Sequence, residues 1–390
     1  MAPPTILAQL LSFIPKRDFR RCVEKHRGNH NIRTFSCWDQ FVCMVVAQLA
    51  RKESLREIET CLRGMKNLLY HTGLQGVVSR STLADANERR SSAIYADFCH
   101  ILIERARPLY ADDNFIKDLD ALVYVLDSTF ITLSLAVCPW AYFGVHPPAA
   151  MRLHTQLDLR GPLPSFLHIS RAKMNDNLFL DLIRIEAGAF YVMDKGYFDL
   201  ARLYKIHQGR AFFIIRRKRY VKFRRIKSML KQKAPSVHSD CIVRCSGPVG
   251  RKKFPDRLRL IKYRDSENKK ELFFLTNNFD MPPATIAQLY KARWQVELFF
   301  RWIKQNLRLD SFLGYSQNAV EIQIWTAVAA YLTVAIAKKK IGIPAPLTQI
   351  VGFLPQALFL KVPIYKALST AVKGNTTEFQ GSSSNQLELL

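Results

Sequence analysis

Residues 289–307 read LYKARWQVELFFRWIKQNL, and this stretch carries the most informative pattern of the chain. An α-helix turns by about 100° per residue, so four of its polar side chains fall within an arc of roughly 60°. They are Tyr290, Arg293, Glu297 and Lys304. The other positions are mostly apolar, which predicts a largely buried helix on which charge is costly unless a partner requires it. A metal centre beside a phosphate would be such a partner.

The composition of the chain favours a nucleic-acid-binding protein. Of its 390 residues, 48% are hydrophobic, which is enough for a large core and for several structural units. Lys and Arg number 58 and Asp and Glu 32, which gives a formal net charge of +26. So large a charge opposes compaction, and a polyanion is the partner that explains it. A membrane surface is the weaker alternative, because no lipidation motif accompanies the charge.

An apolar segment over 322–337 ends at three consecutive lysines. It is shorter than the about 20 residues of a membrane span, which predicts a buried helix with basic residues at its C-terminal end. The eight cysteines include no Cys-x-x-Cys pair, which favours reduced thiols. These features predict a cytoplasmic protein without a membrane partner.

Residues 1–112 have the pattern of a helical N-terminal domain. Within it, a turn leads into a short helical run over 82–90 that contains Asn87, Arg89 and Arg90. A helix, a turn and a short basic helix are compatible with reading a DNA groove, so this domain is expected to bind DNA. A helical bundle with a solvated basic face is the alternative. Six further basic residues add to that face: Lys16, Arg17, Arg20, Arg21, Lys25 and Arg27.

From about residue 120 the pattern changes to short strands. They are expected at 121–126, 130–137, 151–159, 166–171, 189–193 and 211–215, with helices after Asp176 and over 198–207. Strands in series followed by alternating helix and strand predict an α/β fold, a mixed sheet with helices packed on its faces.

Residues 216–277 have the pattern of a β-rich insertion ahead of the 289–307 helix. Its first part, 216–233, contains ten basic side chains with Tyr220 and Phe223 among them. Basic residues interleaved with aromatics suit a groove that follows a nucleic-acid backbone. DNA contact is therefore predicted for Arg216, Arg217, Lys218 and Arg219, and a solvated charged face is the alternative.

Two aspartates, Asp127 and Asp194, each follow a short apolar run. The ends of strands in an α/β sheet open into a crevice, where reactive groups are commonly placed. Together with Glu297 these carboxylates could hold two Mg²⁺ ions, with Mn²⁺ as a substitute. Two such ions about 4 Å apart clamp the attacking and leaving oxygens of a phosphodiester. Asp176 is the spare carboxylate.

The remaining polar residues of the 289–307 stripe are expected to contact DNA. Arg293 and Lys304 would grip a phosphate beside the metals, and Tyr290 would donate a hydrogen bond to it. Helical ion pairing is the alternative, but it stabilises an exposed helix by only about 0.2–0.5 kcal/mol per pair. Trp294 is expected either to pack in the core or to stack on an unpaired base.

These residues resemble the motifs of bacterial DDE transposases of the insertion sequence 4 family. The signature Tyr-x2-Arg-x3-Glu-x6-Lys of that family is matched by Tyr290, Arg293, Glu297 and Lys304. Asp127-Ser128-Thr129 resembles its first acidic motif, and Asp194-Lys195-Gly196-Tyr197 its second. The similarity spans residues 1 to about 370, including an N-terminal domain like the one that precedes many such catalytic domains.

The resemblance implies a ribonuclease H-like fold with a β-rich insertion, and cut-and-paste transposition. Asp127, Asp194 and Glu297 would hold two Mg²⁺ ions. A water would nick the transposon end, the freed 3′-hydroxyl would form a hairpin with the other strand, and after hairpin opening the 3′ ends would join target DNA. In the family, the residues that match Tyr290, Arg293 and Lys304 contact transposon-end phosphates, and two subunits pair two ends in a synaptic complex. A bacterial, nucleoid-associated protein is expected.

The sequence pattern and the resemblance together predict the domains of the chain. We expect a helical N-terminal domain at 1–112, a ribonuclease H-like catalytic domain at 113–345 with the insertion at about 216–277, a C-terminal helical segment at 346–373 and a disordered tail at 374–390. The last five residues, from Gln386 to Leu390, read QLELL and resemble the peptide that docks on bacterial sliding clamps. A frayed or folded-back terminus is the alternative.

One stretch departs from the pattern of close relatives, which usually carry a basic residue and a Lys-Gly-Ala-like turn before the residue matched by His154. Gly144, His146, Pro147 and Pro148 stand there in this chain, which is expected to weaken DNA contacts near the site. Two other functions therefore remain as alternatives. One is a metal-dependent nuclease that cuts without joining, and the other is a catalytically inactive DNA-binding protein.

Overall fold

The computed structural model describes residues 3–74, 76, 78–111, 121–144, 146–161, 163–229, 236–265, 270–306 and 312–373. The chain forms two compact units. The helical unit contains Met1–Leu109 and Trp302–Leu390, and the sheet unit contains Tyr110–Arg301. The sequence QLELL at 386–390 lies outside the described residues.

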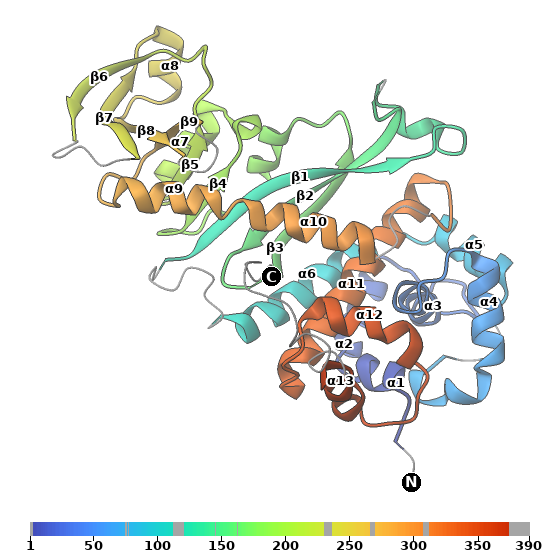
Figure 1. Cartoon of the computed structure of the whole chain (residues 1–390). Helices are drawn as coiled ribbons and strands as arrows, with labels where there is room; N and C mark the ends of the chain where they lie inside the picture. Colours follow the sequence, from blue (N-terminus) through green and yellow to red (C-terminus); the bar gives the residue numbers. More distant parts are fainter. Residues whose placement is uncertain are drawn as a thin grey trace. The chain divides into compact units, whose positions relative to one another are not determined.

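The helical unit is built from both ends of the chain (Figure 1). Its α-helices are α1 (Ile6–Ser12), α2 (Lys16–Lys25), α3 (Cys37–Leu49), α4 (Leu55–Gly64), α5 (Arg80–Arg89), α6 (Ala93–Ala106), α11 (Gln317–Ile341), α12 (Leu347–Ala357) and α13 (Ile364–Lys373). Short 3₁₀ helices lie at Lys66–Leu68, Tyr70–Thr72 and Arg107–Tyr110, the last reaching the sheet unit. The sequence predicts that the catalytic domain ends at 345, whereas the sheet unit ends at Arg301. The difference arises because the chain after Arg301 belongs to the same unit as the N-terminal helices.

Helix α11 is the central helix of this unit. It begins at the N-cap Ser316, whose side chain accepts a hydrogen bond from the Ala319 N–H, and ends before Gly342, which has a φ of +73°. It is longer than the segment expected from the sequence and is apolar enough to cross a membrane by composition. However, 94% of its most apolar window is buried, and it packs against α3 and α6. A helix that is apolar all round is a core helix when other helices cover it.

Two of the three polar residues expected to read a DNA groove near α5, Asn87 and Arg90, are buried. Asn87 is 1% exposed, and its Oδ1 accepts a hydrogen bond from Gln40 Nε2 at 2.7 Å. Arg90 is 7% exposed and donates to the Ser36 carbonyl at 2.7 Å and to the Phe35 carbonyl. Buried polar groups need such partners, so these two side chains hold α5 against α3. That prediction was wrong for Asn87 and Arg90.

The sheet unit contains nine strands in the order β3-β2-β1-β4-β5-β9-β8-β7-β6. They are β1 (Val123–Leu133), β2 (Ala149–Asp158), β3 (Leu163–Arg171), β4 (Phe190–Met193), β5 (Phe212–Arg216), β6 (Phe223–Ser228), β7 (Val237–Cys245), β8 (Leu258–Arg264) and β9 (Glu271–Thr276). Its helices are α7 (Leu200–Gln208), α8 (Pro248–Lys253), α9 (Pro283–Lys291) and α10 (Trp294–Asn306), with 3₁₀ helices η4 (Pro139–Ala141), η5 (Asp176–Asp181) and η6 (Lys195–Tyr197). The unit boundary falls within α10, after Arg301.

The first five strands have the ribonuclease H-like arrangement. β1 pairs antiparallel with β2, and β2 with β3, whereas β4 lies parallel to β1 and β5 parallel to β4. The four later strands, β6 to β9, add an antiparallel extension beyond β5. This confirms the predicted α/β class, and the β-rich insertion continues the same sheet (Figure 1).

The core of the sheet unit lies between the sheet and α7. Alternate residues of β1, β4 and β5 face it, including Tyr124, Tyr191 and Phe213, each fully buried. Leu203 and Ile206 of α7 pack on the same cluster. A spacing of two residues along a strand places these side chains on one face, which fixes the register of the strands that carry the candidate site.

Strand β1 is longer than expected. The runs predicted at 121–126 and 130–137 are one continuous strand up to Leu133, so Asp127 lies inside it and not at its end. The prediction failed because β2 pairs with β1 over ten residues, whereas β4 pairs with only four of them. Leu126 is opposite Met193, the last residue of β4. Asp127 and Asp194 each follow one of these two paired residues, so they lie at the same level of the β1–β4 pair.

Candidate active site

The predicted 289–307 helix is interrupted at Ala292 and Arg293. The Arg293 N–H donates to the Tyr290 carbonyl at 3.1 Å, and the Val296 N–H to the Arg293 carbonyl at 3.2 Å. These are bonds between residues three apart, so the chain passes from α9 to α10 through a turn that is tighter than an α-helix. Tyr290 lies in the last turn of α9, and Glu297 lies in the first turn of α10. A single continuous helix was therefore a wrong prediction.

The turn directs the Arg293 guanidinium between two carboxylates. Its Nη1 lies 2.5 Å from Asp127 Oδ2, and its Nη2 lies 2.7 Å from Glu297 Oε1. The Tyr290 hydroxyl donates to Asp194 Oδ1 at 3.2 Å. Helix α9 itself packs on β4 and β5 (Figure 1). Residues from β1, from the end of β4 and from two helices thus meet in one place.

The ionisation of this cluster is perturbed. Burial raises the pKa of Asp127 to about 6, although Arg293 and the Ser128 N–H lower it, and the negative charges of Glu297 and Asp194 raise it further. Burial, followed by the negative charge of Asp194, raises the pKa of Tyr290 to about 12. The three carboxylates are therefore close enough to influence one another, and a crowded group of like charges favours a bound cation.

The donor chemistry of the cluster fits a hard cation. Asp127, Asp194 and Glu297 offer carboxylate oxygens, which are the ligands that Mg²⁺ and Mn²⁺ prefer. Within the part of the chain that the structure describes, however, no group of three His, Cys, Asp or Glu residues is arranged as a ready metal site. In this arrangement the Arg293 guanidinium lies between Asp127 and Glu297.

Lys304, the last residue of the predicted stripe, and Trp294 both lie on α10. Lys304 is exposed, two turns beyond Glu297 and past the boundary of the sheet unit. Trp294 is 48% exposed, and the Arg301 guanidinium lies 5.9 Å from its ring centroid. The expectation of core packing for Trp294 is therefore wrong, and its indole has a face accessible to a partner.

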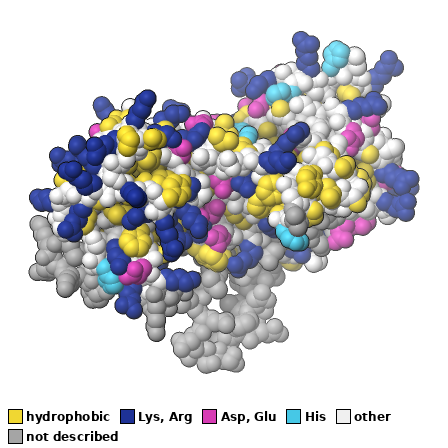
Figure 2. All heavy atoms as spheres, turned by 90° about the horizontal axis from the view of Figure 1, so that it is seen from above, with side chains coloured by type: hydrophobic (Ala, Val, Ile, Leu, Met, Phe, Trp, Pro, Cys, Tyr) yellow, Lys and Arg dark blue, Asp and Glu magenta, His cyan; other side chains and the backbone are white. Residues whose placement is uncertain are grey.

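The four predicted DNA contacts at 216–219 begin at Arg216, the last residue of β5. The Arg217 guanidinium lies 5.8 Å from the Phe273 ring centroid, and the Lys218 ammonium lies 5.8 Å from that of Tyr220. Arg216 is near enough to Tyr290 to lower its pKa, whereas Arg219 is exposed. Figure 2 shows Lys and Arg side chains crowded at this end of the sheet unit, on the left of the view.

Asp176, the spare carboxylate of the sequence, has other partners. Its Oδ1 accepts hydrogen bonds from Ser128 Oγ at 2.6 Å and from Arg152 Nη1 at 2.8 Å. Asp194 occupies the position expected for the second acidic residue, directly after β4. Nothing in the local sequence indicates a role for Arg152, because its contacts join segments far apart in the chain.

A ribonuclease H-like sheet that brings two aspartates and a glutamate together defines a class of enzymes that act on nucleic-acid phosphodiesters. The family model described as the transposase DDE domain matches residues 118–333, so this chain belongs to the DDE transposases. It is a DNA transposase, an enzyme that cleaves DNA. A second family model, a domain of unknown function, matches residues 3–75.

Relatives support this membership. A protein of Sinorhizobium fredii named as a transposase is 34% identical over 282 residues, which cover 71% of this chain and 76% of that protein. The transposase named for insertion sequence element IS5377 of Geobacillus stearothermophilus is 31% identical over 53% of this chain and 54% of its own length. A solved piggyBac transposase synaptic complex with hairpin DNA aligns with a TM-score of 0.46 and 11% identity, over 95% of this chain and 80% of that one.

Proposed function

We propose that this transposase moves an insertion sequence of the insertion sequence 4 type by a cut-and-paste mechanism, with Asp127, Asp194 and Glu297 as its metal-binding and catalytic residues. The observation that supports this best is the register of the sheet. Asp127 and Asp194 follow the paired residues Leu126 and Met193, and the α9–α10 turn places Arg293 against both Asp127 and Glu297.

Bound Mg²⁺ or Mn²⁺ would supply activation of the attacking oxygen and neutralisation of the leaving oxygen. The protein supplies the geometry. Tyr290 holds Asp194 through its hydroxyl, and Arg293 balances the charges of Asp127 and Glu297. With the three carboxylates holding the cation, the Arg293 guanidinium would be available to bind a transposon-end phosphate, because its planar fork suits two phosphate oxygens. Lys304 would bind a second phosphate.

The test uses oligonucleotides that carry the inverted repeats of the element. Asp127→Asn, Asp194→Asn and Glu297→Gln should each reduce Mg²⁺-dependent end cleavage at least 100-fold while end binding persists. Asp256→Asn, in an exposed part of the sheet unit, is the matched control and should cleave normally. Full cleavage by Asp127→Asn would contradict the assignment.

A strand-transfer assay separates the alternatives. Ends with a free 3′-hydroxyl should be joined to target DNA by the wild-type protein. Cleavage without joining would favour a metal-dependent nuclease, and binding without cleavage would favour an inactive DNA-binding protein. Hairpin-ended intermediates on a denaturing gel would support the cut-and-paste route.

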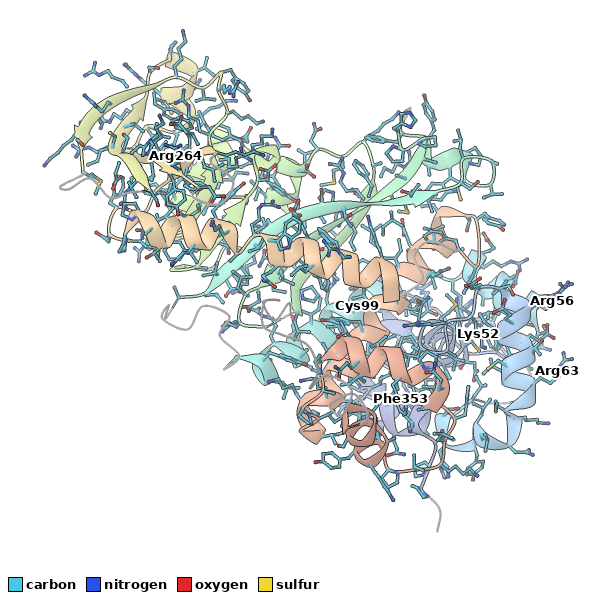
Figure 3. All side chains as sticks on the ribbon, in the orientation of Figure 1. Lys52, Arg56, Arg63, Cys99, Arg264 and Phe353 are labelled. Atoms are coloured by element: carbon cyan, nitrogen blue, oxygen red, sulfur yellow. The ribbon has the colours of Figure 1, made fainter. Side chains whose placement is uncertain are left out.

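We also propose that the helical unit binds DNA through α2 and not through α5. Arg17 and Arg20 of α2 lie three residues apart and are exposed, and Arg27, also exposed, lies just beyond the end of this helix. Of the acidic residues of α2, Asp18 is already paired with Arg105 at 2.5 Å. Helix α4 is less suitable, because Glu57 and Glu59 accompany its basic residues Arg56 and Arg63, and Glu53 accompanies Lys52 just before it (Figure 3).

Further partners follow from the proposed mechanism. Two transposon ends must be paired, so we expect a homodimer that forms a synaptic complex with transposon-end and target DNA at the nucleoid. The QLELL sequence at 386–390 would dock on a sliding clamp. Deletion of these five residues should abolish retention of the protein by immobilised clamp, whereas unchanged retention, or none by the full chain, would exclude the idea.

A further inference from the structure

Asp176, at the start of η5, contacts both segments that carry the catalytic aspartates. Ser128 Oγ donates to Asp176 Oδ1 at 2.6 Å, and the Ser128 N–H donates to Asp127 Oδ1 at 2.8 Å. On the other side, Gly196 packs so closely that a Cβ atom there would lie 3.1 Å from Asp176 Oδ2. Gly196 follows Asp194 by two residues. One carboxylate therefore touches the segment after Asp127 and the segment after Asp194.

Asp176 is itself held firmly. Arg152 Nη1 donates to its Oδ1 at 2.8 Å and to the Met174 carbonyl at 3.0 Å. The Arg152 guanidinium lies 4.4 Å from the ring centroid of Phe130. The Arg152 side chain is 12% exposed and the Asp176 side chain 27%. A hydrogen-bonded ion pair that is this protected from water has a well-defined geometry, and it restricts the positions of the side chains bonded to it.

A second contact fixes η5 against the strands. The ring of Phe179, in the middle of η5, stacks on the ring of His154 with centroids 5.2 Å apart and an interplanar angle of 20°. His154 is fully buried in β2, where it lies opposite Ser128 of β1. Its Nε2 is 3.0 Å from Ser170 Oγ of β3. Contacts with β1 and β2, and through His154 with β3, therefore determine the position of Asp176.

We propose that Asp176 is a positioning residue that sets the separation of Asp127 and Asp194 for binding of a divalent cation. This rests on the proposed function of those two aspartates. Groups behind metal ligands orient them, and their removal commonly weakens metal binding by about 10–100-fold. Oδ1 of Asp176 is engaged by Ser128 and Arg152, so the residue acts through its neighbours and not as a ligand.

The test compares three variants bound to end DNA. Asp176→Asn should weaken Mn²⁺ binding, measured by titration calorimetry, by about 10–100-fold and raise the half-saturating Mg²⁺ concentration for cleavage by a similar factor. Ser128→Ala removes one hydroxyl and should have a smaller effect in the same direction. The double variant should equal Asp176→Asn alone, because both changes weaken the same Ser128–Asp176 connection.

Asp181→Asn is the matched control. Asp181 ends the same helix η5 and pairs with Arg202 at 2.7 Å and with Lys205 at 3.0 Å on the surface, so its loss should leave cation binding unchanged. If the Asp176→Asn variant does not fold, the Ser128→Ala variant tests the proposal, since it retains the Arg152–Asp176 ion pair. Unchanged cation binding in a folded variant, with only a lower melting temperature, would overturn the proposal. Failure of the wild-type protein to bind Mn²⁺ or cleave would instead overturn the proposed function.

Discussion

At the scale of single residues, Arg293 occupies the place where a cation is expected. Its guanidinium is 18% exposed and lies within hydrogen-bond distance of Asp127 and Glu297. Arg293→Gln should destabilise the metal-free protein by about 1–3 kcal/mol, because two half-buried carboxylates lose their counter-charge. Added Mg²⁺ should raise the melting temperature of this variant more than that of the wild type. Arg301→Gln, outside the cluster, is the control, and equal shifts in all three proteins would contradict this role of Arg293.

The Asp127 carboxyl gives a second prediction at this scale. Because its pKa in the folded chain is about 6, above the value of an exposed aspartate, the folded state takes up a proton more readily than the unfolded state. Its contribution therefore favours folding at low pH and is lost as the pH rises through about 6. Urea unfolding of metal-free protein at pH 5 and pH 7 should show a smaller pH dependence for Asp127→Asn than for the wild type. An identical dependence would show that Asp127 ionises normally.

The residues of the site were predictable from the sequence, but not their contacts. Asp127, Asp194 and Glu297 could be proposed from the polar stripe around Glu297 and from the resemblance to the family's acidic motifs, although an aspartate at a strand end is by itself a common turn residue. The pairing of Arg293 with Asp127 could not be predicted, since it joins residues 166 positions apart. The same holds for Asn87 and Arg90, whose polarity indicated a surface although their partners lie on and beside α3.

At the scale of elements, the strands were predicted within a few residues and the break between α9 and α10 was missed. Ala292 and Arg293 are good helix formers, and neither Gly nor Pro marks the turn. The break is consistent with tertiary contacts, because Tyr290 is bound to Asp194 and Arg293 to Asp127. Local propensity differs among such residues by only a few tenths of a kcal/mol, less than a charged hydrogen bond contributes.

Helix α2 carries the prediction that belongs to this scale. Each phosphate contact contributes about 0.9 to the slope of log binding constant against log salt concentration. The double variant Arg17→Gln/Arg20→Gln should therefore bind end DNA more weakly and lower that slope by about two. The variant Arg56→Gln/Arg63→Gln removes the same charge from α4 and should change the slope less. Equal changes would indicate a diffuse charge effect and not a binding face on α2.

At the scale of the whole molecule, the helical unit depends on both ends of the chain. Helix α11 is covered by α3 and α6, so the later part of the chain completes a core begun by the first. Leu332, in the middle of α11, is fully buried. Leu332→Ala should cost about 2–5 kcal/mol, because a cavity remains where the side chain was. Lys340→Ala, at the exposed end of the same helix, should cost almost nothing.

Hydrogen exchange can tell whether this unit unfolds as one. Since α3, α6 and α11 share a core, Leu332→Ala should lower amide protection in all three helices together. The strands β1, β2 and β4 belong to the other compact unit and should keep their protection. Loss of protection confined to α11 would show that the N-terminal helices are stable without it. The helical unit would then be two cooperative parts, and the boundary expected near residue 112 would describe its folding better than the division by contacts.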